Sequence, residues 1–217
     1  MSLKEKIIEI KLHKLLFNYK KFNEFNFIFD DLNEQIVIGF GINKIAGNEY
    51  LQIYLNYTSK VIENKWLKYK ADLDIEDTLM PATIMIDISQ YKNQYSVFFD
   101  ENNFNIKNIS EIKLEFIIEN IIQNLFLPEL ENIRKLKYCN DIINKDILIN
   151  DYLLGYSYWE GLPFRKVLIA QEVNDPRLPE IITAMRKYCD EQYELGKKED
   201  FEKLCKLKPV FEKLFGE

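Results

Sequence analysis

Histidine, glycine, proline and cysteine are all scarce in this chain of 217 residues, which has one histidine, seven glycines, six prolines and three cysteines. The histidine, His13, lacks the partners of a catalytic triad, because no G-x-S-x-G motif supplies a nucleophile for it. Cys139, Cys189 and Cys205 show no CxxC or CxxH spacing. Neither a disulfide framework nor a zinc site is indicated, and we expect no metal and no cofactor.

Long apolar runs are missing too. No stretch approaches the roughly 20 apolar residues of a membrane span, and the start of the chain has no signal-peptide pattern. With 47% hydrophobic and 29% charged residues, the composition is that of a soluble globular protein. We therefore expect a cytoplasmic protein with reduced thiols and no membrane association. The excess of Ile, Asn and Lys over Ala, Gly and Arg is typical of AT-rich genomes and predicts a low-GC bacterium.

The charge balance is acidic, with 35 Asp and Glu residues against 29 Lys and Arg residues and a net charge of −6. Affinity for the phosphates of nucleic acids comes from clustered Lys and Arg, so we expect no nucleic-acid partner. A basic protein is the partner that this charge favours.

The first half of the chain changes its hydrophobic period. Residues 4–20 have the spacing of an amphipathic helix, whereas residues 22–59 alternate with a period of two and predict three strands of an antiparallel meander. A short helix around Trp66 and an acidic loop follow. The segments 82–88 and 94–99 predict a further hairpin on the same sheet.

The second predicted strand carries two glycines on one face, together with Gln35 and Val37. Gly39 and Gly41 leave room there for a helix, another backbone or a ligand to approach closely. No helix N-terminus follows them, so these glycines do not indicate a phosphate loop.

From Ser110 onward the helical period dominates. Pro128 is expected to begin the helix after the one that starts at Ser110. Further helical segments are expected at 146–155, 163–173, 178–195 and 198–215. If Gly196 turns one helix back onto the next, Cys189 and Cys205 reach the same level of that hairpin as buried, unbonded thiols.

This order of elements predicts an α+β fold. Residues 1–144 are expected to form an antiparallel sheet of about five strands with packed helices. Residues 145–217 are expected to form an all-α helical-hairpin extension that packs on it.

Two short motifs are similar to those of an uncharacterised bacterial α+β domain family. They are the aromatic first strand, with Phe25, Phe27 and Phe29, and the segment Leu127-Pro128-Glu129-Leu130. The resemblance covers residues 10–140 at most. It implies the fold of that family and transfers no functional site.

One set of residues could form a metal-dependent nuclease-like site. Asp100 ends an expected strand, and Glu111 and Lys113 form an E-x-K triplet that could supply a second metal ligand and a cation for the transition state. The triplet needs to lie on a strand, whereas Ser110 and Glu111 read better as the start of a helix. We therefore keep a divalent-metal hydrolase acting on nucleic acid as the alternative function.

The preferred interpretation is a non-enzymatic protein-binding factor, such as an immunity or antitoxin-like protein. An acidic loop could attract a basic partner through Asp72, Asp74, Glu76 and Asp77; it resembles the start of a calcium loop but lacks that loop's glycine and bidentate Glu. Tyr158 and Trp159 form the second candidate contact, because Trp and Tyr dominate interface hot spots. Packing between helices is the competing role for these two aromatics.

Overall fold

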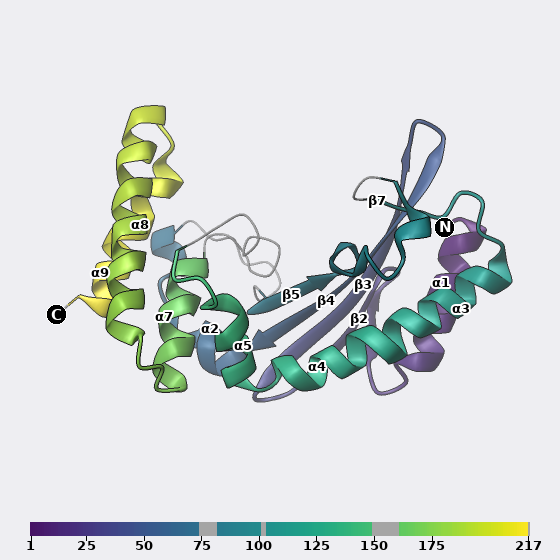
Figure 1. Ribbon diagram of the computed structural model, residues 1–217, viewed down its shortest axis with the longest axis horizontal. Helices are drawn as coiled ribbons and strands as arrows, with labels where there is room; N and C mark the ends of the chain where they lie inside the picture. Colours follow the sequence, from purple (N-terminus) through teal and green to yellow (C-terminus); the bar gives the residue numbers. More distant parts are fainter. Residues whose placement is uncertain (74–81, 101–102, 149–160, 217) are drawn as a thin grey trace. The chain divides into compact units, whose positions relative to one another are not determined.

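The computed structural model describes residues 1–73, 82–100, 103–148 and 161–216. It has the predicted α+β fold, with a seven-stranded sheet and helices that predominate toward the C-terminus (Figure 1). The chain forms two compact units, each built from two segments. Unit 1 contains Met1–Tyr57 and Met85–Asn132, and unit 2 contains Thr58–Ile84 and Ile133–Glu217. This division differs from the predicted one at residue 144, since Thr58–Ile84 is grouped with the C-terminal helices.

The sheet begins with the predicted meander, which the structure confirms and extends by one strand. Its strands are β1 (Lys20–Asn23), β2 (Asn26–Asp30), β3 (Glu34–Ile45), β4 (Asn48–Ser59), β5 (Ile84–Asp87), β6 (Phe99–Asp100) and β7 (Asn103–Asn105). Their order is β1-β2-β3-β4-β7-β6, and β5 also pairs with β4. Between β3 and β4, Ala46 and Gly47 have φ angles of 48° and 76°, the left-handed conformation of a tight two-residue hairpin turn.

The predicted hairpin of residues 82–88 and 94–99 is wrong in its second half. Residues 84–87 do form β5, but the carboxylate of Asp87 accepts a hydrogen bond from the Ser89 amide at 2.8 Å. This cap starts the 3₁₀ turn η2 (Ile88–Tyr91) and ends the strand. Ser96–Phe98 form another 3₁₀ turn, η3, and the antiparallel pair in this region is β6 with β7.

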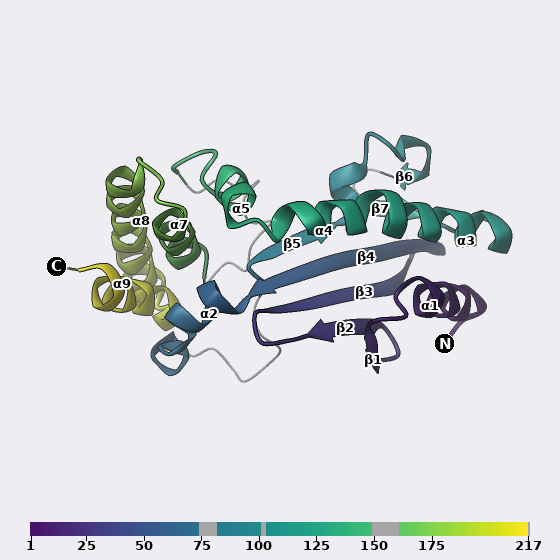
Figure 2. The ribbon, with the colours of Figure 1, turned by 90° about the horizontal axis from the view of Figure 1, so that it is seen from below.

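The helices of unit 1 cover one face of the sheet (Figure 2). Helix α1 (Leu3–Leu15) starts with a capping box, in which the Ser2 hydroxyl accepts from the Glu5 amide at 3.3 Å and Glu5 accepts from the Ser2 amide. Helix α3 (Glu111–Asn120) starts at the Ser110 N-cap, as predicted. Several side chains of this layer are fully buried against the sheet: Ile8, Leu12, Leu114, Ile118, Ile53 and Leu55.

Pro128 does not begin a separate helix. Helix α3 continues through a π-helical segment, η4 (Ile121–Phe126), into α4 (Leu127–Ile133). The Leu127 amide donates to the Ile122 carbonyl, five residues back. A proline has no amide to donate, so this wider turn lets the helix pass Pro128 without ending.

The last three helices of unit 2 overlap the predicted segments 163–173, 178–195 and 198–215. The helix Leu136–Ile143 was not predicted as a separate element, and residues 146–148 are not helical. The rest of the predicted segment 146–155 lies outside the described residues. The elements are α2 (Lys60–Leu67), the 3₁₀ turn η1 (Lys70–Leu73), α5 (Leu136–Ile143), α7 (Leu162–Glu172), α8 (Leu178–Glu199) and α9 (Glu202–Phe215). The predicted short helix around Trp66 is thus confirmed as α2.

Helices α8 and α9 form the predicted hairpin, but the turn is not at Gly196. The chain reverses after α8 at Asp200, whose φ angle is 55°. Gly196 lies inside α8, where an added Cβ would come within 2.7 Å of the Cys205 sulfur, so this glycine permits close helix packing. The Cys205 thiol lies 3.6 Å from the Tyr193 carbonyl. Cys205 therefore stands about one turn away from the level of Cys189. Both thiols are unbonded as predicted, but Cys205 is partly exposed, whereas Cys189 is buried.

Candidate functional site

A fully buried ion pair joins α2 to α7 in unit 2. Arg165 donates from Nε to Glu63 Oε1 at 2.9 Å and from Nη2 to Glu63 Oε2 at 2.8 Å. Trp66, one turn after Glu63, donates its indole N–H to Oε2 at 2.9 Å, and the Thr83 hydroxyl donates to Oε1 at 2.6 Å. Both charged side chains have no solvent exposure. A buried carboxylate is tolerated only when it is paired and its oxygens accept hydrogen bonds. We therefore interpret this cluster as one that stabilises the fold of unit 2.

A second buried network holds the end of α5. Lys166 donates from Nζ to the carbonyls of Ile143 at 2.7 Å and Asp146 at 2.6 Å. Asn144 donates from its side chain to Asn140 Oδ1 at 2.8 Å and to the Lys166 carbonyl at 2.9 Å. The lysine thus satisfies carbonyls that the end of a helix leaves without partners.

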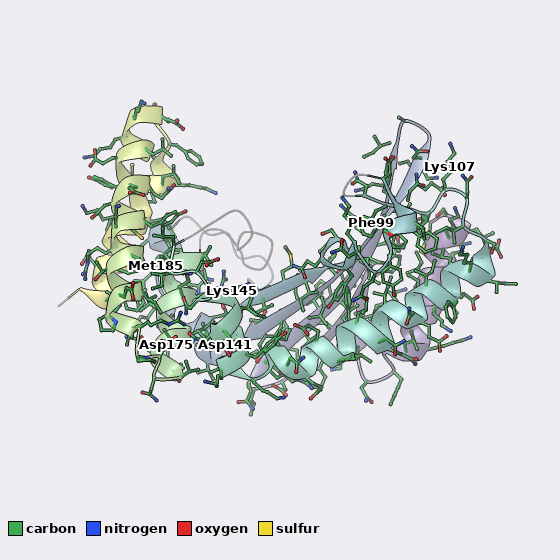
Figure 3. The ribbon with its side chains drawn as sticks, in the orientation of Figure 1. Phe99, Lys107, Asp141, Lys145, Asp175 and Met185 are labelled. Carbon is green, nitrogen blue, oxygen red and sulfur yellow. The ribbon has the colours of Figure 1, made fainter. Side chains whose placement is uncertain are left out.

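The same network continues to Asp175, which lies between α7 and α8 (Figure 3). Asp175 accepts from Asn140 at 2.6 Å and pairs with the Arg177 guanidinium at 2.8 Å. Hydrogen bonds from Arg177 hold the pKa of the Asp175 carboxyl well below its usual range. The charges of Asp175 and Arg177 pair with each other, so a structural role fits them better than a catalytic one.

The stability of unit 2 should depend on pH through Lys166. Burial lowers the pKa of its ammonium from 10.5 to about 8. Between pH 8 and 10.5 the folded state then binds fewer protons than the unfolded state, so the free energy of unfolding rises with pH, and below pH 8 the contribution is constant. Urea unfolding at several pH values, for the wild type and Lys166→Met, should show a difference that grows across this window.

The thiol of Cys189 on α8 contributes a slope of opposite sign, and this contribution cancels when the two proteins are compared. Burial raises the pKa of Cys189 from 9.0 to about 12, which lowers stability as pH rises through that range in both proteins. A wild-type minus variant difference that stays flat between pH 8 and 10.5 would contradict the assignment to Lys166.

The nuclease-like residues do not meet the requirement that their motif lies on strands. Asp100 is on β6 and accepts from the Tyr50 hydroxyl at 3.1 Å, but Glu111 is the first residue of α3. The Lys113 ammonium lies 4.9 Å from the centre of the Phe98 ring. In the described part of the chain, no three His, Cys, Asp or Glu side chains are grouped to hold a metal ion.

Most of the predicted binding residues lie outside the described residues, namely Asp74, Glu76, Asp77, Tyr158 and Trp159. The one described residue of the acidic loop, Asp72, is in η1 and pairs with Lys213 of α9 at 2.7 Å. Both of these side chains are about half exposed, with relative exposures of 46% and 53%. The Asp72 carboxylate is therefore already paired with a lysine of unit 2.

The outer side of α3 combines apolar and acidic residues. Ile112 and Phe116 are one turn apart and are 84% and 68% exposed. Glu111 and Glu115 are exposed on the same helix, and Glu119 pairs with Lys11 of α1 at 2.7 Å. An exposed aromatic and an exposed aliphatic residue at i, i+4 spacing form a continuous apolar contact on a helix surface.

Negative charge is concentrated in the unit that carries this face. Unit 1 contains 15 acidic and 10 basic residues, whereas unit 2 contains 20 and 19, so five of the six net charges belong to unit 1. From residue 111 to 132 there is one basic residue, Lys113, against five acidic ones: Glu111, Glu115, Glu119, Glu129 and Glu131. Sequence reasoning missed this face, although a helix with apolar residues outside its core stripe is a readable signal.

Comparison of the chain with protein-family models, curated proteins and solved structures found no match. The resemblance to an uncharacterised bacterial domain family therefore stays a prediction. Among the helices that the structure describes, none is both long and apolar enough to cross a membrane.

Proposed function

We propose that the protein is a non-enzymatic binding factor of a bacterial cytoplasm, of the immunity or antitoxin type, whose partner is a basic protein. The observation that carries this proposal is the outer face of α3, where exposed Ile112 and Phe116 lie among Glu111 and Glu115. Large apolar side chains anchor an interface by burying area, and a rim of one charge selects a partner of the opposite charge.

The distribution of charge supports the same partner. With a net excess of five acidic residues in unit 1, a cationic protein is attracted before contact, which raises the association rate. Salt screens this attraction over about 8 Å at physiological ionic strength, so the association rate should fall as salt is added. The acidic loop at residues 72–77 and the pair Tyr158 and Trp159 remain candidate contacts on unit 2.

The alternative of a metal-dependent nuclease has less support. Its E-x-K triplet needs a strand that presents Glu111 and Lys113 together beside Asp100, whereas both residues belong to the first turn of α3. No other observation favours hydrolysis, so we propose a single function.

Truncating Phe116 should weaken partner binding most. Phe116→Ala removes the larger anchor and should cost about 2 kcal/mol, roughly 30-fold in affinity, because buried aromatic anchors dominate interface energy. Glu115→Lys should slow association and reduce its salt dependence. The measurement is quantitative pull-down from the native lysate, followed by binding kinetics with the recovered partner at several salt concentrations.

Matched controls separate the α3 face from general surface effects. Val97 is 85% exposed in unit 1, so Val97→Ala removes an exposed apolar side chain elsewhere. Glu24→Lys changes the net charge as Glu115→Lys does, at an exposed position outside α3. Equal recovery of every partner by Phe116→Ala and Val97→Ala would reject the α3 face as the contact.

A further inference from the structure

The second face of the sheet in unit 1 carries an unusual set of side chains. Along β4, core residues alternate with Tyr50, Gln52, Tyr54 and Asn56. Strand geometry places these four on the face opposite the buried Leu51, Ile53 and Leu55, which are at most 2% exposed. The helices α1, α3 and α4 cover the face of those apolar residues (Figures 1 and 2). The other face is therefore lined by tyrosines and amides.

Two glycines of β3, Gly39 and Gly41, lie beside this row of β4 side chains. A Cβ added at Gly39 would lie 2.3 Å from Cζ of Tyr54, so the tyrosine ring lies directly across the glycine. The Tyr54 hydroxyl donates to Asn26 Oδ1 of β2 at 2.7 Å, which fixes the ring. Among the described residues, no atom lies within 4 Å of a Cβ added at Gly41. The predicted room for close approach is thus filled by Tyr54 at Gly39, and no described residue fills it at Gly41.

A polar cavity of about 160 Å³ lies at one end of the row. Strand β7 pairs with Tyr50 and Leu51 of β4, so Gln52 lies just past the last paired residue. Five polar residues line the cavity, together with apolar neighbours: Asn43, Gln52, Asp87, Ser89 and Asn103. The cavity has room for several water molecules and so for a small ligand.

The chemistry of this lining selects neutral ligands that are rich in hydroxyls. Among the described residues that line the cavity, none is a lysine or an arginine, so this lining offers no cation to a phosphate or carboxylate. Each of its three amide side chains both donates and accepts hydrogen bonds. A sugar hydroxyl does the same, and the ring of Tyr50, the one tyrosine among the described lining residues, suits the apolar face of a sugar ring.

Two amide oxygens on this face are buried without a hydrogen-bond donor from the described part of the chain. Gln35 Oε1 and Asn56 Oδ1 are buried without a partner among the described residues, and Gln35 is 8% exposed. Each of these atoms has less than 1 Å² of accessible surface, so a ligand that arrives from solvent does not reach them, and they lie outside the cavity. Asn56 lies four residues from Gln52, about 13 Å along the strand. That spacing exceeds one sugar ring.

We propose that unit 1 binds a neutral saccharide, with one ring in the cavity beside Gln52 and Asn103. Hydroxyls of this ring bond to the cavity amides. The site is independent of the α3 face, which lies on the helical side of the sheet.

Side-chain amide resonances in ¹H–¹⁵N NMR spectra report on this site directly. The probes are D-glucose, D-galactose, D-mannose and N-acetyl-D-glucosamine. At least one monosaccharide should shift the amides of Asn43, Gln52 and Asn103. The side-chain amides of Gln35 and Asn56, which lie outside the cavity, should not shift.

Variants test whether the binding is specific to the cavity. Gln52→Leu should weaken binding at least tenfold, whereas Gln123→Leu, an exposed position on η4 of the helical layer, should leave it unchanged. Two results would overturn the proposal. They are no shift of the cavity amides at sugar concentrations on the order of 50 mM, far above millimolar dissociation constants, and a larger shift with glucose 6-phosphate than with glucose.

Discussion

Replacing Arg165 with methionine should lower the free energy of unfolding of unit 2 by about 3 to 5 kcal/mol. The substitution leaves the Glu63 carboxylate buried without its cation, and Glu63 has no solvent exposure. Methionine approximates the volume of the arginine stem, so the loss arises from the unpaired charge and not from a large cavity. Urea unfolding followed by tryptophan fluorescence measures it, since the sequence of unit 1 contains no tryptophan.

The double variant Glu63→Gln/Arg165→Met is the matched control. A glutamine keeps an oxygen that can accept from Trp66 or Thr83, and neither residue of the new pair is charged. The double variant should therefore be more stable than Arg165→Met alone, because replacing a whole buried pair is less costly than breaking it. A loss below about 1 kcal/mol for the single variant would show that water reaches Glu63.

Trp66→Ala should destabilise unit 2 by a similar amount, about 3 to 5 kcal/mol. The indole is 1% exposed and stacks on Phe164 with ring centres 5.5 Å apart. An added Cβ at Gly161 would come within 2.6 Å of the indole, so the ring fills its site tightly. Truncation leaves a cavity and also removes a donor to Glu63.

Trp66→Phe separates these two losses. Phenylalanine keeps most of the aromatic packing but has no N–H for Glu63, so a smaller loss of about 1 to 2 kcal/mol is expected. Far-UV circular dichroism during urea unfolding suits both variants, because each removes an indole. Equal losses for Trp66→Ala and Trp66→Phe would mean that the hydrogen bond, rather than packing, dominates.

Periodicity predicted the elements whose signal is local. The meander follows from residues that alternate between core and surface, and the start of α3 follows from Ser110, whose hydroxyl accepts from the Lys113 amide. Local chemistry also explains two errors. The cap at Asp87 ended β5 earlier than periodicity suggested, and the π-helical turn carried α3 past Pro128.

Contacts between distant residues had no comparable signal. Glu63 and Arg165 are 102 residues apart. In the sequence, Glu63 belongs to Glu63-Asn64-Lys65, an E-x-K triplet of the kind that arises by chance in a chain rich in Glu and Lys. The one hint in the sequence was the position of Glu63 between the apolar residues Ile62 and Trp66 on a short helix. This position indicates a buried carboxylate that needs a partner, but it does not identify Arg165. The hairpin of α8 and α9 was predicted, but its register depends on pairs such as Arg186 with Glu212, which periodicity does not fix.

Photo-crosslinking at position 116 tests the central claim, that the outer face of α3 contacts a protein partner. A photoreactive phenylalanine analogue replaces Phe116, and the control carries it at Leu32, which is 93% exposed in unit 1. Irradiation in native cells should give a discrete crosslinked species with a basic protein from position 116 and none from position 32. The same crosslinks from both positions, or no crosslink from position 116, would contradict the proposed function.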